Sequence, residues 1–94
     1  MSAWFYILHL RSSSLYCGST RSLDKRINDH FSGRACRTTK IDPPISLAYS
    51  EEYLTYKEAF QREQQVKCWN RAKKNALISG DINELKHLAK RRKR

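Results

Sequence analysis

One stretch near the N-terminus constrains the fold more than any other: two strand-like runs separated by a short polar break. The first run, Trp4–Leu10, is rich in aromatic, β-branched and long apolar residues, and the second run is Leu15–Gly18. Between them lies Arg11–Ser14, a polar segment that is typical of a turn. We therefore predict a β-hairpin, which determines which side chains can face one another.

The register of this hairpin places two tyrosines together. We expect Leu10 to pair with Ser14. Tyr6 then lies opposite Gly18, and Tyr16 falls on the same sheet face as Tyr6, as a diagonal neighbour roughly 7–8 Å away. Gly18 would leave open space over the Tyr6 ring, which suits a ligand that approaches the backbone. The alternative is that both tyrosines are core residues whose hydroxyl groups reach water.

The length and the charge bound the class of protein. Ninety-four residues suffice for one domain with a modest core, which we place at residues 1–89. The net charge is +10, and the segment Lys90–Arg94 supplies five of these charges; we expect it to be a disordered basic tail. An excess of positive charge attracts polyanions, of which nucleic acid is the usual one. The alternative is a soluble basic protein without a specific partner.

Cysteine usage and hydropathy indicate the compartment. Cys17, Cys36 and Cys68 have neither CxxC nor Cys/His spacing, which argues against a disulfide framework and against a zinc site. No run approaches the roughly 18 apolar residues of a membrane span, and no signal-peptide pattern is visible. A membrane surface also fits poorly, because no basic helix carries a strong apolar face. We therefore expect a cytoplasmic protein without a membrane partner.

A helix is predicted over Leu23–Ser32, with Ser22 as N-cap and Gly33 beyond its end. Arg26 and His30 are four residues apart and share a face that borders the apolar stripe. Taken singly, Arg26 could be a solvated charge, and His30 could interact with the C-terminal helix dipole. Their common position beside the buried edge favours a joint role.

The middle of the chain is predicted to be a loop followed by a strand. Residues 34–44 are basic and rich in threonine, and Arg37 and Lys40 in this loop suit phosphate contacts or are simply solvated. Ile45–Glu51 alternates between apolar and polar residues and is predicted to form a third strand.

Two further helical segments complete the prediction. We expect one helix over Thr55–Arg71, continuing for a further turn or two to Ile78, and a last helix over Ile82–Lys90. The predicted fold class is therefore α+β: a small three-stranded antiparallel sheet flanked by helices, in the order β-β-α-β-α-α.

Glu63 is the most informative residue of the Thr55–Arg71 helix. It lies in the centre of an apolar stripe formed by Tyr56, Ala59, Phe60 and Val66. A carboxylate in such a place must be paired, hydrogen-bonded or bound to a cation. One interpretation is an ion pair with Lys67 at i+4. The other is a ligand for Mg²⁺, which needs only one or two protein carboxylates; Asn70 lies on the same line and could support such a site.

The order of these polar residues resembles the GIY-YIG nuclease family, in particular its small, stand-alone, single-domain members of the UPF0213 kind. The first family motif matches Trp4-Phe5-Tyr6, the second matches Tyr16-Cys17-Gly18, and the arginine and histidine of the next helix follow. Further matching positions are Ser50-Glu51-Glu52, Ala59, Arg62-Glu63-Gln64, Lys67, Trp69, Arg71 and Lys73-Lys74. The resemblance covers about Trp4 to Ile78. Trp4 and Phe5 replace the Gly and Ile of the first motif, and Cys17 replaces the central Ile of the second; all three are packing positions.

The resemblance implies a metal-dependent DNA endonuclease that hydrolyses phosphodiester bonds, in DNA repair or in the processing of irregular DNA structures. One Mg²⁺ or Mn²⁺ ion would be held by Glu63, and Arg26 would stabilise charge on the phosphoryl oxygens. Tyr6 would activate water with the help of His30, and Tyr16 would orient water or phosphate. Because a free tyrosine has a pKa of about 10, such a base needs neighbouring cations that lower its pKa.

The expected partner is DNA, bound non-specifically or by its structure, and no small-molecule cofactor is implied. The predicted nucleic-acid-binding residues are Arg37, Lys40, Lys67, Arg71, Lys73 and Lys74. Asn70 and Asn75 are both candidates for a later asparagine of the family, and Gly18 is a supporting residue. The alternative function is a nucleic-acid-binding module on the same fold, with weak or lost catalysis.

Overall fold

The predicted hairpin forms the central strand and one edge of a three-stranded antiparallel sheet in the computed structural model, which describes residues 2–80. Strands β1 (Ala3–Leu10) and β2 (Leu15–Thr20) pair with Tyr6 opposite Gly18, which confirms the predicted register. The backbone N–H of Leu10 donates to the carbonyl of Ser14 over 2.9 Å and closes the turn. The third strand, β3 (Pro44–Tyr53), pairs with the other edge of β1, so β1 is central.

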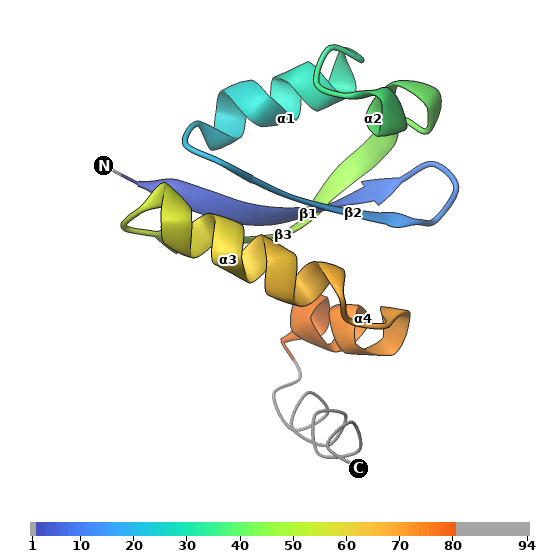
Figure 1. Ribbon diagram of the computed structural model, residues 1–94. Helices are drawn as coiled ribbons and strands as arrows, with labels where there is room; N and C mark the ends of the chain where they lie inside the picture. The colour runs from blue at the N-terminus through green and yellow to red at the C-terminus, as the bar shows by residue number, and fades with distance from the viewer. Residues whose placement is uncertain (1, 81–94) are drawn as a thin grey trace.

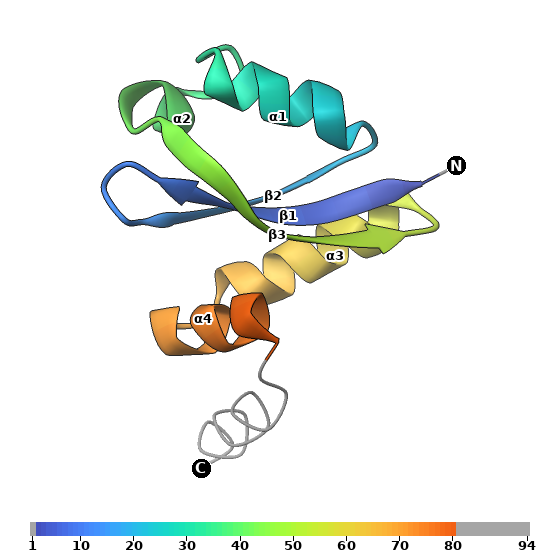
Figure 2. The same cartoon turned by 180° about the vertical axis from the view of Figure 1, so that it is seen from behind.

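Helices cover both faces of this sheet (Figure 1). Helix α1 (Leu23–Phe31) and the short helix α2 (Arg37–Ile41) lie on one face. Helices α3 (Tyr56–Lys67) and α4 (Arg71–Ser79) lie on the other, as the reverse view in Figure 2 also shows. The α+β class and the predicted order of strands and longer helices are confirmed.

Two predicted segment boundaries were wrong. The segment 34–44 is not entirely a loop, because Arg37–Ile41 forms α2. The predicted Thr55–Arg71 helix ends at Lys67, and a separate helix begins after Asn70, whose side chain accepts the backbone N–H of Lys73 over 2.9 Å. An asparagine that satisfies a free N–H in this way is a favourable N-cap, so the chain starts a new helix there. The predicted Ile82–Lys90 helix, the domain limit at residue 89 and the basic tail lie outside the described residues.

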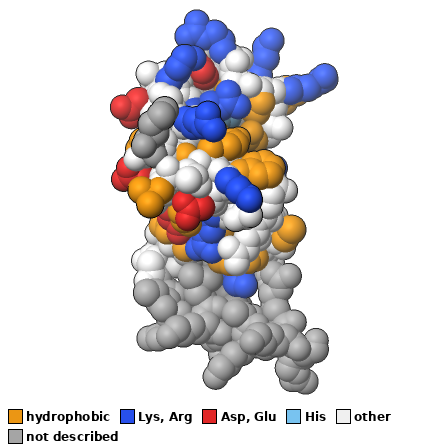
Figure 3. Space-filling model, turned by 60° about the vertical axis from the view of Figure 1, so that its left-hand side comes forward, with side chains coloured by type: hydrophobic (Ala, Val, Ile, Leu, Met, Phe, Trp, Pro, Cys, Tyr) orange, Lys and Arg blue, Asp and Glu red, His pale blue; other side chains and the backbone are white. Residues whose placement is uncertain are grey.

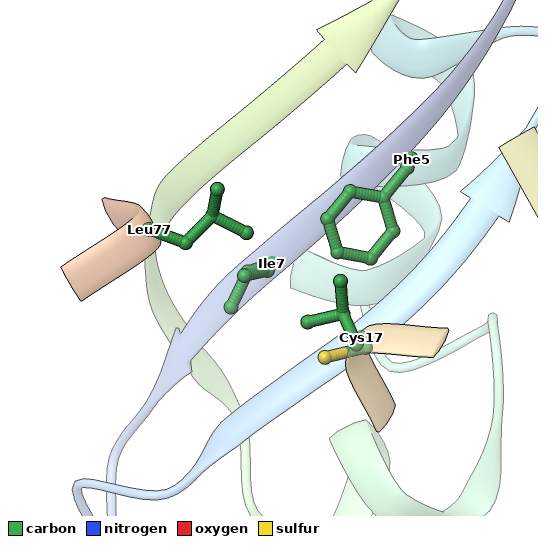
Figure 4. Packing of buried hydrophobic residues seen from close by; sticks show 5 residues of the cluster. Phe5, Ile7, Cys17 and Leu77 are labelled. Atoms are coloured by element: carbon green, nitrogen blue, oxygen red, sulfur yellow. The ribbon is translucent and has the colours of Figure 1, made fainter. Parts of the chain in front are cut away.

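The central strand is buried on both faces, which explains why its sequence is almost continuously apolar. Toward α3 and α4, the core consists of Phe5, Ile7, Cys17, Val66 and Leu77 (Figure 4). Toward α1, the side chains of Tyr6, Leu8 and Leu10 pack with Tyr16, Leu23 and Ile27. Tyr6 and Tyr16 therefore share one sheet face, as predicted.

Some predicted stripe residues are not in the core. Phe31, Tyr56 and Phe60 are all more than one-third exposed, so the apolar stripes of α1 and α3 are narrower than their sequences indicated. Among the described residues, no helix is long and apolar enough to span a bilayer.

Candidate active site

The side chains predicted for proton transfer gather under α1. His30 is fully buried, and its ring packs edge-on against the rings of Tyr6 and Tyr16, with centroid distances of 5.7 Å and 5.1 Å. Arg26, one helical turn before His30, interacts with the Tyr6 hydroxyl. The spacing of four residues on α1 therefore brings both polar side chains of the helix to the tyrosine face of the sheet.

Hydrogen bonds join these groups into a chain. The Tyr6 hydroxyl lies 2.8 Å from His30 Nε2, and His30 Nδ1 lies 2.8 Å from Thr39 Oγ1 on α2. The Thr39 hydroxyl is placed to donate to the carbonyl of Cys36, 3.5 Å away. In the tautomer that this contact favours, Thr39 accepts the Nδ1–H of His30, and Nε2 accepts the Tyr6 O–H. Arginine can only donate, so Arg26 donates its hydrogen bond to a lone pair of the same Tyr6 oxygen.

The pKa values of Tyr6 and His30 are consistent with a hydrogen bond donated by Tyr6 to His30. Burial raises the pKa of Tyr6 to about 12, although the interaction with Arg26 acts in the opposite sense. Burial, and then the charge of Arg26, lower the pKa of His30 to about 4. At neutral pH, Tyr6 is thus a protonated donor and His30 an uncharged acceptor. Arg26 lowers the pKa of Tyr6, as a neighbouring cation should, but burial is the larger effect.

Tyr16 has a different environment. Its hydroxyl accepts a weak hydrogen bond from the thiol of Cys36, at 3.6 Å, and burial raises its pKa. Cys36 and Thr39 were not predicted as partners of the tyrosines. Cys36 directly precedes the short helix α2, and Thr39 lies within it. The sequence of this segment has no strong periodic pattern, so only the folded structure shows that the two residues reach this site.

The space over Gly18 is not open. A Cβ atom at Gly18 would lie 2.4 Å from the Tyr6 hydroxyl oxygen, so the tyrosine ring fills the volume that a side chain on β2 would need. The expectation of room for a ligand over this ring was therefore wrong. Glycine is required at this point so that the ring can lie against the backbone.

Glu63 projects from α3 on the opposite side of the sheet. Its side chain is only 11% exposed. Ser19 Oγ, on the edge strand β2, donates to one carboxylate oxygen over 2.7 Å, and Lys67 Nζ donates to the other over 3.1 Å. The predicted ion pair with Lys67 is present. The neighbouring Arg62 instead pairs with Glu51 of β3 at 3.0 Å, which fastens α3 to the sheet.

The two halves of the site meet across the edge of β2. An open groove is lined there by Ser19, Thr20, Arg21, Arg26 and Tyr56. Arg26 belongs to the tyrosine half, and Ser19 is the hydrogen-bond partner of Glu63. The negative charge of Glu63 adds a smaller contribution than burial to the raised pKa of Tyr6. Figure 3 shows this side of the molecule, with Lys and Arg side chains gathered toward its upper end.

The predicted DNA-contacting residues have unequal surroundings. Arg37 and Lys40 of α2 and Arg71 of α4 are exposed. Lys73 is buried, with its ammonium nitrogen 4.2 Å from the centre of the Trp69 ring, so it contributes to packing. Lys74 is half-buried on α4.

The two asparagine candidates have local partners. Asn70 caps α4, and Asn75 accepts from the side chain of Arg71 over 3.3 Å. Neither asparagine is therefore needed to explain how Glu63 is held.

A metal site must be built from few protein ligands. Within residues 2–80, no group of three or more His, Cys, Asp or Glu side chains is arranged to hold an ion. Mg²⁺ retains much of its water and requires only one or two carboxylates. The buried carboxylate of Glu63, together with the Ser19 hydroxyl, fits a site of that kind and does not fit a cage of several carboxylates.

A hairpin with paired tyrosines, an Arg/His helix and a later helical glutamate are the features on which the sequence resembles the GIY-YIG family. The sequence matches the model of the GIY-YIG catalytic domain over residues 2–75, and the chain belongs to the GIY-YIG family, a family of nucleases. It is similar to a UPF0213 protein of Bacillus pumilus, with 40% identity covering 80% of this chain and 76% of the relative. A UPF0213 protein of Staphylococcus saprophyticus is also 40% identical, over 81% of this chain and 93% of the relative.

A solved structure supports the fold assignment. The solution NMR structure of a UPF0213 protein from Bacillus halodurans is 34% identical, covers 84% of each chain and gives a TM-score of 0.55. The resemblance seen in the sequence, including its UPF0213 character, is thereby confirmed.

Proposed function

We propose that this protein is a metal-dependent endonuclease that hydrolyses phosphodiester bonds in DNA. The observation that carries the proposal is the buried hydrogen-bond chain in which the Tyr6 hydroxyl lies 2.8 Å from Nε2 of His30 and Thr39 lies 2.8 Å from its Nδ1. It lies beside Arg26, and the groove at the β2 edge connects it to the carboxylate of Glu63. The net charge of +10 favours a polyanionic substrate.

The chain supports proton transfer without a preformed tyrosinate. As the Tyr6 oxygen accepts a proton from the attacking water, its own proton can pass to Nε2 of His30, 2.8 Å away. The Tyr6 proton therefore has an acceptor at hydrogen-bond distance, so no tyrosinate has to form before water attacks. Thr39 holds His30 in the required tautomer, and Tyr16 packs on the histidine ring and orients water or phosphate.

The remaining charges act on the phosphate. Arg26 faces the groove and stabilises the negative charge that develops on the phosphoryl oxygens. Glu63, oriented by Ser19, is the residue that would hold Mg²⁺ or Mn²⁺. Such an ion supplies Lewis-acid stabilisation of the phosphate and of the leaving oxygen. Irregular DNA structures, such as those that arise in repair, are the substrates we propose, and the cytoplasm is the proposed location.

A second function is favoured by one observation. Both carboxylate oxygens of Glu63 already have hydrogen-bond donors, and the Tyr6 side chain is only 1% exposed. A DNA-binding module with weak or lost catalysis would have the same arrangement. The two functions differ in whether bound DNA is cut.

A plasmid-nicking assay tests the proposal. Supercoiled plasmid is incubated with the protein and Mg²⁺ or Mn²⁺, and binding is measured in parallel. We expect nicking by the wild type and by Glu52→Gln, a control at an exposed carboxylate on β3. Tyr6→Phe, which keeps the ring and removes the hydroxyl, and Glu63→Gln should bind DNA without nicking it. Binding without nicking by the wild type would instead support the binding module.

A further inference from the structure

An exposed aromatic pair lies beside the groove. Tyr56 and Phe60 are 37% and 43% exposed, and their rings are stacked, with centroids 6.2 Å apart and planes inclined by 23°. They are one turn apart on α3, and Tyr56 lies beside the edge strand β2. Helix α3 is otherwise attached to the sheet by fully buried Ala59 and Val66, so the fold does not need these two rings.

This pair is continuous with the positively charged part of the groove. Tyr56 lines the groove together with Arg21 and Arg26, and the guanidinium of Arg21 lies 5.4 Å from the centre of the Tyr56 ring. The Tyr56 hydroxyl also lies 3.4 Å from Ser19 Oγ, and Ser19 is the partner of Glu63. Orange hydrophobic side chains adjoin blue Lys and Arg side chains on this side of the molecule in Figure 3.

The chemistry of the surface selects one kind of occupant. Aromatic rings beside arginines match a ligand with flat faces and negative charges, and a nucleic-acid strand has both. The bases of a duplex are already stacked on their neighbours, so their faces are not available to these rings. Unpaired bases are available, and they stack on aromatic side chains with little dependence on sequence.

We infer that Tyr56 and Phe60, together with Arg21, form a stacking surface for unpaired bases next to the scissile phosphate, which makes the protein selective for single-stranded or flapped DNA. This inference rests on the proposed function for the location of the cut, but the binding preference stands apart from catalysis. The arginines hold the phosphates, and the rings hold the bases. A partner protein or a second copy of this chain on the same surface is the competing occupant.

Binding measured without divalent ions separates this inference from the nuclease proposal. Fluorescence anisotropy is recorded for a labelled single strand, for the matching duplex and for a strand of the same length whose central residues are abasic. The proteins are the wild type, Tyr56→Ala/Phe60→Ala and the control Leu54→Ala, which removes another exposed apolar side chain close by. Tyr56→Phe keeps the ring and should bind as the wild type does.

The double variant should lose about tenfold or more of its affinity for the single strand, since base stacking on an aromatic ring contributes roughly 1–3 kcal/mol per base. Its affinity for the duplex and for the abasic strand should stay within about twofold of the wild type. Leu54→Ala should bind all three ligands normally. Unchanged single-strand affinity, or an equal loss on all three ligands, would overturn the inference.

Two further readouts complete the test. Sedimentation should show the same mass for the wild type and the double variant; dissociation of a wild-type oligomer by these substitutions would show that the rings serve a second copy instead. If the wild type fails to nick plasmid yet shows the base-dependent binding, the proposed catalysis fails and the stacking surface stands. If the wild type nicks plasmid but shows no base-dependent binding, the nuclease proposal stands and the stacking surface fails.

Discussion

Replacing Thr39 by valine tests the hydrogen-bond chain with almost no change in shape. Thr39 is 1% exposed, and its hydroxyl is the partner of fully buried His30 Nδ1 at 2.8 Å. Valine substitutes a methyl group for the hydroxyl, so one nitrogen of His30 loses its partner and water cannot replace it. An unsatisfied buried polar group costs about 1–3 kcal/mol. A domain of this size has a total stability of roughly 5–15 kcal/mol, so the loss is readily measured.

Thr38→Val is the matched control. Thr38 lies in the same short helix but is exposed, so the change in helix propensity is the same and no buried group is affected. Urea denaturation should give a free energy of unfolding for Thr39→Val that is about 1–3 kcal/mol below that of Thr38→Val, with similar m-values. A difference smaller than about 0.5 kcal/mol, the range of ordinary surface substitutions, would refute the reasoning.

The same variant has a spectroscopic readout. In the wild type, the ¹⁵N shifts of His30 should identify Nδ1 as the protonated nitrogen, because Thr39 accepts its hydrogen. In Thr39→Val that restraint is lost, and we expect a shift toward the Nε2–H tautomer. An Nε2–H tautomer already dominant in the wild type would mean that His30 donates to Tyr6, and the proposed direction of proton transfer would be wrong.

Four other changes test separate parts of the molecule. The free energy of unfolding should fall as the pH drops from about 6.5 to about 4, because the unfolded state then binds a proton at His30 that the folded state does not; the loss is at most about 3 kcal/mol and should be absent from His30→Gln. Glu63→Gln should change the stability of the metal-free protein by no more than about 1 kcal/mol, since the lysine that it leaves is 54% exposed, while nicking disappears. Gly18→Ala should destabilise the protein by about 1–3 kcal/mol in thermal melts, because the new Cβ overlaps the Tyr6 hydroxyl. Deleting Lys90–Arg94 should weaken DNA binding and flatten its salt dependence, because five positive charges are removed.

Each of these four predictions has an outcome that would contradict it. A pH profile that persists in His30→Gln would show that another group titrates over this range. A destabilised Glu63→Gln protein that still nicks plasmid would remove the metal-ligand assignment and favour the lysine pair as the sole role. Full stability of Gly18→Ala would mean that the Tyr6 ring can move away from β2. An unchanged salt slope after the deletion would place the DNA contacts elsewhere.

The hairpin could be predicted because its constraints are local. A polar break between two strand-like runs fixes the turn, and a glycine opposite Tyr6 fits only one register. The burial of Glu63 was likewise predictable, since its helical neighbours at i−4 and i+3, Ala59 and Val66, are apolar and buried. Such inferences need only the periodicity of one element at a time.

Other features depend on how elements meet. The sequence does not specify that β2 is an edge strand, so it could not indicate that Ser19 of β2 is the hydrogen-bond partner of Glu63. The pairing of His30 with Thr39 depends on the fold of a segment without clear periodicity. Tyr56 and Phe60 were assigned to the core because hydrophobicity alone does not distinguish a buried stripe from an aromatic surface.

The central position of β1 also has a consequence for the order in which the chain folds. Its pairing with β2 closes a short loop, so hairpin and α1 can form from contacts close in sequence, whereas its pairing with β3 joins Tyr6 to Ser50. Long-range pairing is the slower event because the entropy of a large loop must be lost first. We therefore expect the tyrosine–histidine half of the site to be structured in the folding transition state, which high φ-values at Leu8 would show. The Glu63 half should form later, which low φ-values at Val66 would show. The catalytic groups would thus be assembled in the order in which they occur along the chain.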